Sequence, residues 1–477
     1  MSHSQSPSTI QFGTDGWRAV IADEYTFDNV QRVARATAQW LHEDYGDAPS
    51  VVLGHDTRFL GPEFTEYVAR VLAATGVQVT VAPAFASTPS VSWATHAKEA
   101  DAGVVITASH NPPKYNGYKI KANFGGPAPP AMIAAVEGHI ERLPEHSEPV
   151  PAFDALKAEG HIAVDDYVSA YLLALRERLD IDAIQSSGLT IAHDAMYGSA
   201  QGHVTRLLGA DQVTELHHDL NPGFHGQAPE PIEQNLFELA NVMADGACDM
   251  GLANDGDGDR VALFDEQGNY VSSHRILAVL VKYLYEERGL EGQVVKTFST
   301  THMLDTMCEA YGLPLKTTPI GFKYIADKMV TADILVGGEE SGGIAAKGHI
   351  PERDGIYIGL LIAEMVVKRG KPLSALVQEL YDEFGPHRTY RSDIHITDEQ
   401  KRNVLTRLDD QGGLSEISGH AVDRVETLDG FKHITDGGWL LIRPSGTEPV
   451  LRVYSEAETA AAAKALVDDA AAQLELE

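Results

Sequence analysis

The sequence predicts an α/β protein built of three similar units, with a smaller α+β domain at the end of the chain. Its 477 residues are too many for one hydrophobic core, and about 100–200 residues per domain gives three or four domains. Short apolar runs alternate with helical patterns through most of the chain, as in βαβ units around a mainly parallel sheet. The alternation stops near Phe384. We therefore expect domains at 1–165, 166–267, 268–383 and 384–477.

The first unit is expected to begin with a helix capped by Thr26, because a hydroxyl at this position can satisfy the first free N–H groups of a helix. Three short apolar runs after it predict strands at 51–53, 77–81 and 103–106. The apolar face of the helix, at helical spacing, comprises Val30, Val33, Ala34, Trp40 and Leu41.

The pattern restarts twice. A helix at 167–179 and a strand at 189–192 open the second unit, and a helix at 276–285 and a strand at 294–295 open the third. An apolar run at 356–367 is too short to cross a bilayer, so it predicts a core helix. In the last domain we expect strands at 393–396, 422–428, 439–442 and 450–454 and a closing helix at 458–474.

The charge of the chain argues against two classes of protein. The formal net charge is −32, from 69 acidic and 37 basic residues. Nucleic-acid binders need a basic stripe, and an anionic membrane would repel such a chain. We therefore expect neither nucleic acid nor membrane as a partner. Solubility and adaptation to a salty cytoplasm explain the acid excess equally well.

Two features favour the cytoplasm. Cys248 and Cys308 have neither CxxC nor zinc-like spacing, which predicts buried free thiols in a reducing compartment. The N-terminal stretch 1–11 is polar and contains no apolar segment of the signal-peptide type.

The first motif that carries chemistry is the segment 107–113, which contains Ser109 and His110 directly after a predicted strand. Loops at the carboxyl ends of strands in open α/β sheets are where ligands bind. Taken alone, the segment is more often a polar turn than a site. Lys119, ten residues further on, could hold phosphate or shuttle protons, although an isolated lysine is more often a solvated charge.

The second motif places Asp255, Asp257 and Asp259 at alternate positions of a glycine-rich loop. Carboxylates at this density repel one another unless a hard cation binds them, which predicts a Mg²⁺ site. The rival is an EF-hand with Glu266 as the twelfth residue of its loop. It is disfavoured because Arg260 occupies the position of the required glycine and the flanks resemble strands.

The third motif is the segment 337–343, where Glu339 and Ser341 offer a carboxylate and a hydroxyl on a glycine-rich loop. Such groups suit sugar hydroxyls, and an acidic surface turn is an equally good explanation of the segment alone. Lys323, on another glycine turn, is a weaker candidate for substrate contact.

The fourth motif, 443–449, combines the guanidinium of Arg443 with the hydroxyls of Ser445 and Thr447 around Gly446. This combination predicts an anion clamp without a Walker motif, against the alternative of a simple β-turn. Near the N-terminus, Arg18 is a further cation in a glycine loop.

Together the four motifs, in this order along nearly the whole chain, resemble the α-D-phosphohexomutase family of phosphoglucomutases and phosphomannomutases. The resemblance implies three similar mixed-sheet α/β domains plus a smaller C-terminal α+β domain around one central cleft. It implies a phosphoserine enzyme that interconverts hexose 1-phosphate and hexose 6-phosphate through hexose 1,6-bisphosphate, with Mg²⁺ as cofactor and a sugar phosphate as partner.

The resemblance also assigns roles to residues of this chain. Ser109 matches the phosphoserine, whose phosphate completes the metal site of the three aspartates. The expected catalytic residues are Ser109, His110, Lys119 and Arg18. The expected substrate-binding residues are Lys323, Glu339, Ser341, Arg443, Ser445, Gly446 and Thr447.

One position departs from part of the family. Some dual-specificity relatives, and the phosphoglucosamine mutases, end the sugar loop with histidine, where this chain has Gly343. We therefore expect glucose as the preferred sugar and mannose as the second. The alternatives are a dual-specificity mutase or a phosphomannomutase, a catalytically silent sugar-phosphate-binding protein, and a calcium-binding protein built on the acidic loop.

Overall fold

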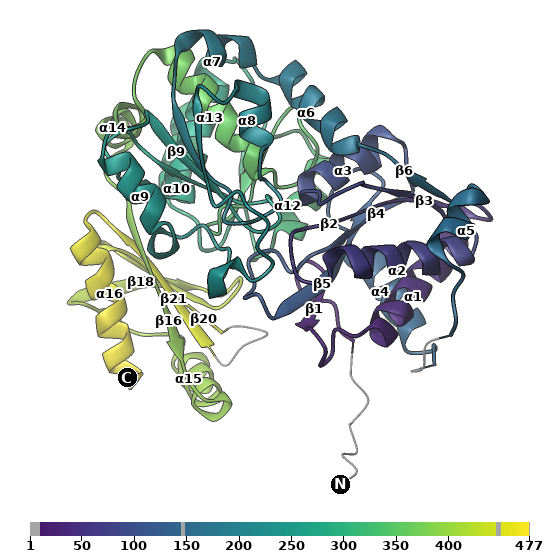
Figure 1. The fold of residues 1–477 in the computed structure, drawn as a ribbon. Coiled ribbons are helices and arrows are strands. Elements are labelled where there is room, and N and C mark those ends of the chain that lie inside the picture. The colour runs from purple at the N-terminus through teal and green to yellow at the C-terminus, as the bar shows by residue number, and fades with distance from the viewer. Residues whose placement is uncertain (1–9, 145–147, 445–449, 477) are drawn as a thin grey trace.

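The computed structural model describes residues 10–144, 148–444 and 450–476, and this part of the chain forms four β-sheets with their helices. Figure 1 shows the first sheet and its helices on one side of the molecule, the second and third together on the other, and the last below them. We call these parts unit 1, unit 2, unit 3 and the terminal domain. The predicted multidomain α/β class is confirmed.

Unit 1 is a mixed sheet between two layers of helices. Its strands are β1 Trp17–Val20, β2 Ser50–His55, β3 Gln78–Val81, β4 Ala102–Ile106, β5 Tyr115–Ala122 and β6 Ile162–Val164, and its helices are α1 Phe27–Tyr45, α2 Gly61–Ala74, α3 Thr88–Ala97, α4 Pro130–Ile140 and α5 Phe153–Ala158. The strand order is β1-β5-β4-β2-β3-β6, with β1 and β5 antiparallel to their neighbours. Side chains of β2 alternate between the faces, so Val51 packs towards α1 and α2 while Val52 packs against α3.

Unit 2 repeats the centre of this sheet. Its elements are α6 Tyr167–Arg178, α7 Ile181–Ser187, β7 Ile191–Asp194, α8 His203–Leu208, β8 Val213–Leu216, α9 Phe237–Ala244, β9 Met250–Asn254, β10 Val261–Phe264 and β11 Tyr270–Val271. The order β8-β7-β9-β10 corresponds to β3-β2-β4-β5 of unit 1, again with three parallel strands and an antiparallel fourth.

Unit 3 repeats the arrangement once more. Its elements are α10 Ser273–Glu286, β12 Gln293–Thr297, α11 Met303–Tyr311, β13 Leu315–Thr318, α12 Phe322–Thr331, β14 Ile334–Gly338, β15 Ile344–Ala346, α13 Gly355–Arg369 and α14 Leu373–Phe384. The order is β13-β12-β14-β15. In each unit, therefore, the loop after the third strand of the repeat (β4, β9 or β14) carries one of the predicted motifs.

Units 2 and 3 share one hydrophobic core. Helix α13 packs on α7 of unit 2 as well as on β15 of its own unit, and every residue from Gly355 to Val366 is buried. The predicted core helix at 356–367 is thus confirmed, and it joins two units. Among the described residues, no helix is long and apolar enough to span a membrane.

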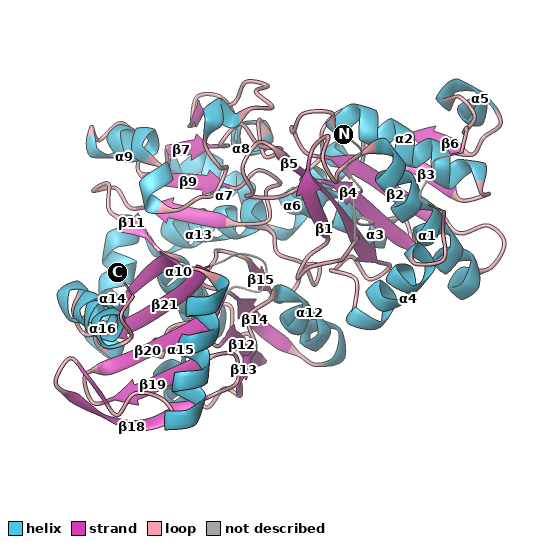
Figure 2. Ribbon diagram, turned by 90° about the horizontal axis from the view of Figure 1, so that it is seen from below, coloured by secondary structure: helices cyan, strands magenta, loops and turns pink. Residues whose placement is uncertain are grey.

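The terminal domain is an antiparallel sheet covered by two helices, whose strands run side by side in Figure 2. Its elements are β16 Arg388–His395, α15 Asp398–Gln411, β17 Glu416–Ile417, β18 His420–Glu426, β19 Phe431–Thr435, β20 Gly438–Pro444, β21 Val450–Ala457 and α16 Ala460–Gln473. Trp439, Leu441 and Tyr454 form an apolar cluster with Phe298 of unit 3, which attaches the domain to the rest of the molecule.

Candidate active site

Ser109 lies in the loop between β4 and β5, which we call the serine loop. Its hydroxyl faces the loop between β9 and β10 of unit 2, which carries the three aspartates and which we call the acidic loop. Its Oγ donates to Oδ2 of Asp255 at 2.7 Å, and only 1% of the residue is exposed. The backbone φ is +51°, in the left-handed region that serine seldom adopts. Its N–H donates to Oγ1 of Thr107 at 2.8 Å, which helps to hold this conformation. The two motifs that the sequence placed far apart therefore meet at this hydroxyl.

The three aspartates of the loop between β9 and β10 form a buried cluster. Asp255, Asp257 and Asp259 each offer an oxygen within 4.8 Å of the others. One oxygen each of Asp257 and Asp259 is buried without a hydrogen-bond partner among the described residues. Burial and the two neighbouring carboxylates raise the pKa of Asp255 well above its usual value. A hard divalent cation bound here would offset the repulsion between the carboxylates and the cost of burying oxygen atoms without partners. The cluster therefore fits such an ion.

The same structure disfavours an EF-hand. Asp255–Asp259 are flanked by β9 and β10 rather than by helices. The carboxylate of Glu266 accepts from the backbone N–H of Ser374 at 3.3 Å, so it points into unit 3 and does not join the three aspartates.

Lys119 neutralises part of this cluster from unit 1. Its Nζ lies 2.7 Å from Asp257, 3.1 Å from Asp259 and 2.8 Å from Asp15, and the side chain is fully buried. Burial alone would lower the pKa of Lys119, but the three carboxylates outweigh it and raise the pKa above its usual value. The ammonium is therefore a fixed positive charge, which favours phosphate stabilisation over proton shuttling.

Arg353 is a second fixed cation, which the sequence did not single out. It precedes α13 and lies 2.7 Å from Asp259, and it also contacts Asp15. The cluster thus joins residues of units 1, 2 and 3. The signal in the sequence was the run of charged residues, Glu352 to Asp354, directly before an apolar helix.

Arg18 and His110 flank Ser109. Nη1 of Arg18 donates to Oδ1 of Asn111 at 2.7 Å, within the serine loop. Nδ1 of His110 lies 3.2 Å from Oγ of Ser109. Burial, followed by the charges of Arg260 and Arg18, holds the pKa of His110 well below its usual value. The imidazole is therefore neutral at physiological pH and can accept a proton at the serine oxygen.

The loop between β14 and β15 lies beside the acidic loop. The backbone N–H of Val261 donates to the carbonyl of Gly342 at 3.1 Å, and Arg260 pairs with Gly343 in a β-bridge. Glu339 is buried in this loop, and Ser341 is half-buried. The structure thus brings the third predicted motif to the second.

Lys323 is the second residue of α12, directly after the turn at Gly321 that precedes this helix. A Cβ added to Gly321 would meet the methyl group of Thr14 at 2.8 Å, so the turn packs closely on the N-terminal loop of unit 1. The half-buried Lys323 forms no ion pair with the residues that the structure describes, and its Nζ lies 5.3 Å above the ring of Tyr324. Its charge is available to an anion.

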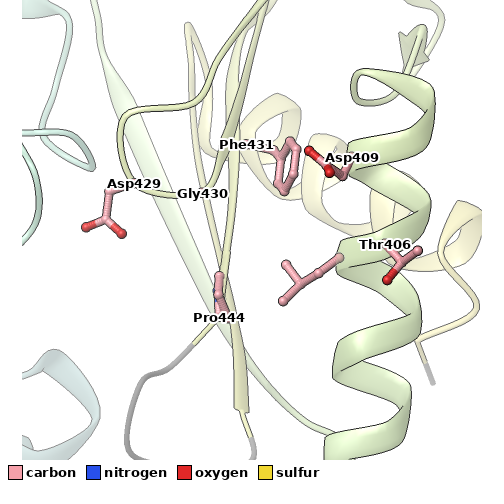
Figure 3. A pocket seen from close by; sticks show the side chains of 7 residues that line it. Thr406, Asp409, Asp429, Gly430, Phe431 and Pro444 are labelled. Carbon is pink, nitrogen blue, oxygen red and sulfur yellow. The ribbon is translucent and has the colours of Figure 1, made fainter.

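Arg443 lies one residue before the end of β20 and is connected to the turn at Gly321 through Asp429. Its Nε lies 2.9 Å from Oδ1 of Asp429, whose other oxygen accepts from the N–H of Ile320 at 2.8 Å. Ser445, Gly446 and Thr447 lie outside the described residues. A pocket of about 400 Å³ lies between β19, β20 and α15. In Figure 3, Phe431 and Asp409 lie between the strands and the helix, and Asp429 lies on the loop at the other side of the strands. Arg443 thus belongs to the junction of unit 3 and the terminal domain.

Comparison with known proteins agrees with this arrangement. Four family models match the chain: phosphoglucomutase/phosphomannomutase, alpha/beta/alpha domain I at residues 9–147, domain II at 169–268 and domain III at 272–384, and the C-terminal domain at 402–473.

Individual relatives match over nearly their whole length. A phosphoglucomutase/phosphomannomutase of Thermococcus kodakarensis is 31% identical over 94% of both chains, and a phosphoglucosamine mutase of Latilactobacillus sakei is 31% identical over 98% of this chain and 99% of its own. A protein of Thermus thermophilus, provisionally assigned as a phosphomannomutase, has a crystal structure that matches with a TM-score of 0.86 and 33% identity, over 98% of this chain and 99% of its own. The chain belongs to the phosphoglucomutase/phosphomannomutase family and is a phosphohexomutase, an isomerase that acts by phosphoryl transfer.

Proposed function

We propose that this mutase interconverts hexose 1-phosphate and hexose 6-phosphate, with glucose as the preferred sugar, through phosphorylated Ser109 and hexose 1,6-bisphosphate. The observation that carries the proposal is the 2.7 Å contact between Oγ of Ser109 and the buried carboxylate cluster at Asp255. A serine placed there can present its phosphate to the cation that the cluster fits.

Asp255, Asp257 and Asp259 would hold Mg²⁺, with the serine phosphate as a further ligand; when bound, the ion neutralises charge that develops on the transferred phosphoryl group. The buried cations of Lys119 and Arg353 lie beside the same carboxylates and contribute fixed positive charge. Because phosphoryl transfer depends mainly on position and charge, these groups supply most of what the reaction needs.

The protons balance over one cycle. In the first step the bond from phosphorus to Oγ of Ser109 breaks as the oxygen of the free sugar hydroxyl bonds phosphorus. The proton that this hydroxyl loses is the one that Oγ gains, and the neutral imidazole of His110, 3.2 Å from Oγ, can accept it and pass it on. In the second step the other phosphate of the turned intermediate transfers to Oγ, and the proton of Oγ returns by the same imidazole to the sugar oxygen that leaves phosphorus.

The sugar phosphate would be held at the junction of unit 3 and the terminal domain. Lys323 offers a charge that no described residue pairs with, Glu339 and Ser341 offer groups for sugar hydroxyls, and Arg443 would bind the phosphate that is not transferred. We extend this last role to Ser445, Gly446 and Thr447, which follow in the same segment. This anion clamp must bind the phosphate at either end of the sugar. It should therefore recognise the negative charge of the phosphate rather than the geometry of the sugar.

The preference for glucose rests on Gly343. A Cβ at this position would meet Cδ of Arg353 at 2.4 Å, so the space in which other members carry histidine is filled by arginine. Mannose remains the second candidate, and glucosamine is a third, since relatives at 31% identity are called phosphoglucomutase/phosphomannomutase and phosphoglucosamine mutase. Turnover of the 1-phosphates of glucose, mannose and glucosamine, compared as kcat/KM, decides between them, and a higher value for mannose or glucosamine would overturn the assignment.

The test of the mechanism is mass spectrometry of the purified protein with and without Ser109→Ala. We expect a substoichiometric phosphoryl group on Ser109 that glucose 1,6-bisphosphate increases, and its loss together with activity in the variant. Asp257→Ala should abolish Mg²⁺-dependent turnover because it removes a proposed ligand. Full mutase activity in Ser109→Ala would refute the phosphoserine mechanism.

A further inference from the structure

The loop between β2 and α2, residues 56–60, supports the backbone of the serine loop, although none of the predicted motifs includes it. Its Arg58 is 1% exposed and donates to four carbonyl groups of the serine loop. These hydrogen bonds are 2.6 Å to Ser109, 2.6 Å to Asn111, 3.0 Å to Pro112 and 3.1 Å to Tyr115. One guanidinium thus fixes the backbone of the whole turn, which its planar fork of donors suits.

The charge of Arg58 is not available to a substrate. Its Nε lies 3.1 Å from Oδ2 of Asp56, which is itself fully buried. The same carboxylate oxygen accepts from Oγ1 of Thr107 at 2.6 Å, and that hydroxyl accepts from the N–H of Ser109. The pair therefore acts on Ser109 through its backbone on both sides, and its role is placement rather than charge neutralisation.

The same loop also reaches the supports of the acidic loop in unit 2. Oγ1 of Thr57 donates to the carbonyl of Tyr197 at 2.6 Å. Two residues on, the N–H of Ser199 donates to the carbonyl of Gly256 at 2.9 Å, inside the acidic loop. The guanidinium of Arg58 lies 5.0 Å from the ring centre of Phe224, also of unit 2. One short loop thus connects the backbone of Ser109 with the backbone beside Asp255.

We infer that Arg58 is a positioning residue that sets Oγ of Ser109 against the metal site across the boundary of units 1 and 2. This inference rests on the proposed function of Ser109. It predicts that Arg58 acts on the phosphoryl-transfer step and not on sugar-phosphate binding, because Lys323 and Arg443 come from other parts of the fold. The loss of a single placement contact can cost about a hundredfold in rate.

The experiment compares Arg58→Met and Arg58→Lys with Arg70→Met. Arg70 is a matched control because it too donates to two backbone carbonyls of unit 1, at 2.8 Å to Pro151 and 3.1 Å to Val150, on α2 away from the site. We expect Arg58→Met to lower kcat about a hundredfold, with KM for glucose 1-phosphate changed less than about threefold. Arg58→Lys should recover part of kcat, and Arg70→Met should retain all of it.

Two further measurements separate placement from folding. The rate at which glucose 1,6-bisphosphate phosphorylates Ser109 should fall in parallel with kcat, whereas equilibrium binding of glucose 1-phosphate in a Ser109→Ala background should not change. If Arg58→Met does not fold, Thr57→Val removes only the bond to Tyr197 and should still slow phosphorylation without raising KM. Unchanged kcat in a folded Arg58→Met, or a KM that rises as much as kcat falls, would overturn the inference. Failure of the wild-type protein to become phosphorylated would instead refute the proposed function.

Discussion

At the scale of single residues, the site is built from side chains whose ordinary behaviour has been altered by burial. Ser109 has a left-handed backbone that is costly for a residue with a Cβ, and such conformations persist only where surrounding contacts impose them. His110 is kept neutral, and Lys119 is kept charged. Each of these states suits the proposed phosphoryl transfer through Ser109.

Glu339 is the residue whose titration should be visible in substrate binding. Burial raises the pKa of Glu339 to about 7, with the cation of Arg353 acting in the opposite direction. An ionised carboxylate accepts hydrogen bonds from sugar hydroxyls better than the acid does. We therefore expect KM for glucose 1-phosphate to rise severalfold as the pH falls from 8 to 6.

The substrate phosphate also titrates near pH 6, so the comparison needs a variant. Glu339→Gln should have a raised KM at both pH values and should lack the part of the pH dependence that belongs to the carboxyl group. Identical pH profiles of KM in the wild type and in Glu339→Gln would show that the Glu339 carboxylate does not bind the sugar hydroxyls.

At the scale of secondary-structure elements, the sequence predicted what depends on local pattern. Thr26 does accept a hydrogen bond from the N–H of Asn29 at the start of α1, and the run before the acidic loop is β9. The strand predicted at 189–192 is β7, shifted two residues towards the C-terminus. Boundaries move in this way because pairing with neighbouring strands, not local composition, ends a strand.

In the terminal domain, β19 and α15 were missed because their sequences hide their burial. Strand β19 is buried but contains Lys432 and His433, which interrupt the apolar pattern. Helix α15 buries only Val404 and Leu408, so it has too narrow an apolar face to show a period. Among the site residues, Arg58 was missed for a different reason: its partners are backbone carbonyls more than fifty positions away, which leave no local pattern.

The buried side chain of Lys432 should make the stability of the fold depend on pH. Its Nζ donates to the carbonyl of Phe298 at 2.9 Å and lies 4.0 Å from the ring centre of Trp439. Burial, followed by the charge of Lys296, lowers the pKa of Lys432 to about 7. Between pH 7 and the usual pKa of lysine, this side chain binds a proton in the unfolded chain but not in the folded chain. The stabilisation from this group is therefore complete above the usual pKa of lysine and is lost progressively as the pH falls from there to the folded pKa of about 7.

Thermal unfolding at pH 7 and pH 9 measures this effect. The melting temperature of the wild type should rise over this interval relative to that of Lys432→Met. Lys464→Met, an exposed lysine on α16, is the control and should follow the wild type. A constant difference between the wild type and Lys432→Met would show that the ammonium stays protonated in the fold.

At the scale of the whole molecule, the distribution of charge matters more than its total. The net charge is −32, yet the segments around the acidic loop gather buried cations from units 1 and 3. Lys119 and Lys121 come from β5, and Arg353 precedes α13. The acidic excess keeps the protein dispersed, while these cations are held in place by the buried carboxylates with which they pair.

The ion pair of Lys121 with Glu352 joins units 1 and 3, and its removal should show how much of the assembly depends on it. The two groups lie 2.6 Å apart, and both side chains are fully buried. Lys121→Met removes the closer cation of a buried carboxylate and leaves only Nε of Arg353, 3.6 Å away. Breaking a buried pair typically costs about 3–5 kcal/mol, whereas replacing both partners with apolar groups is often neutral. We therefore expect a marked fall in melting temperature and in activity for Lys121→Met, and recovery of most of both in Lys121→Met/Glu352→Met. Nζ of Lys121 is also 3.6 Å from Asp15, so recovery should be incomplete. A double variant no more stable than the single one would mean that Lys121 acts through Asp15 at the site and not through the contact between the units.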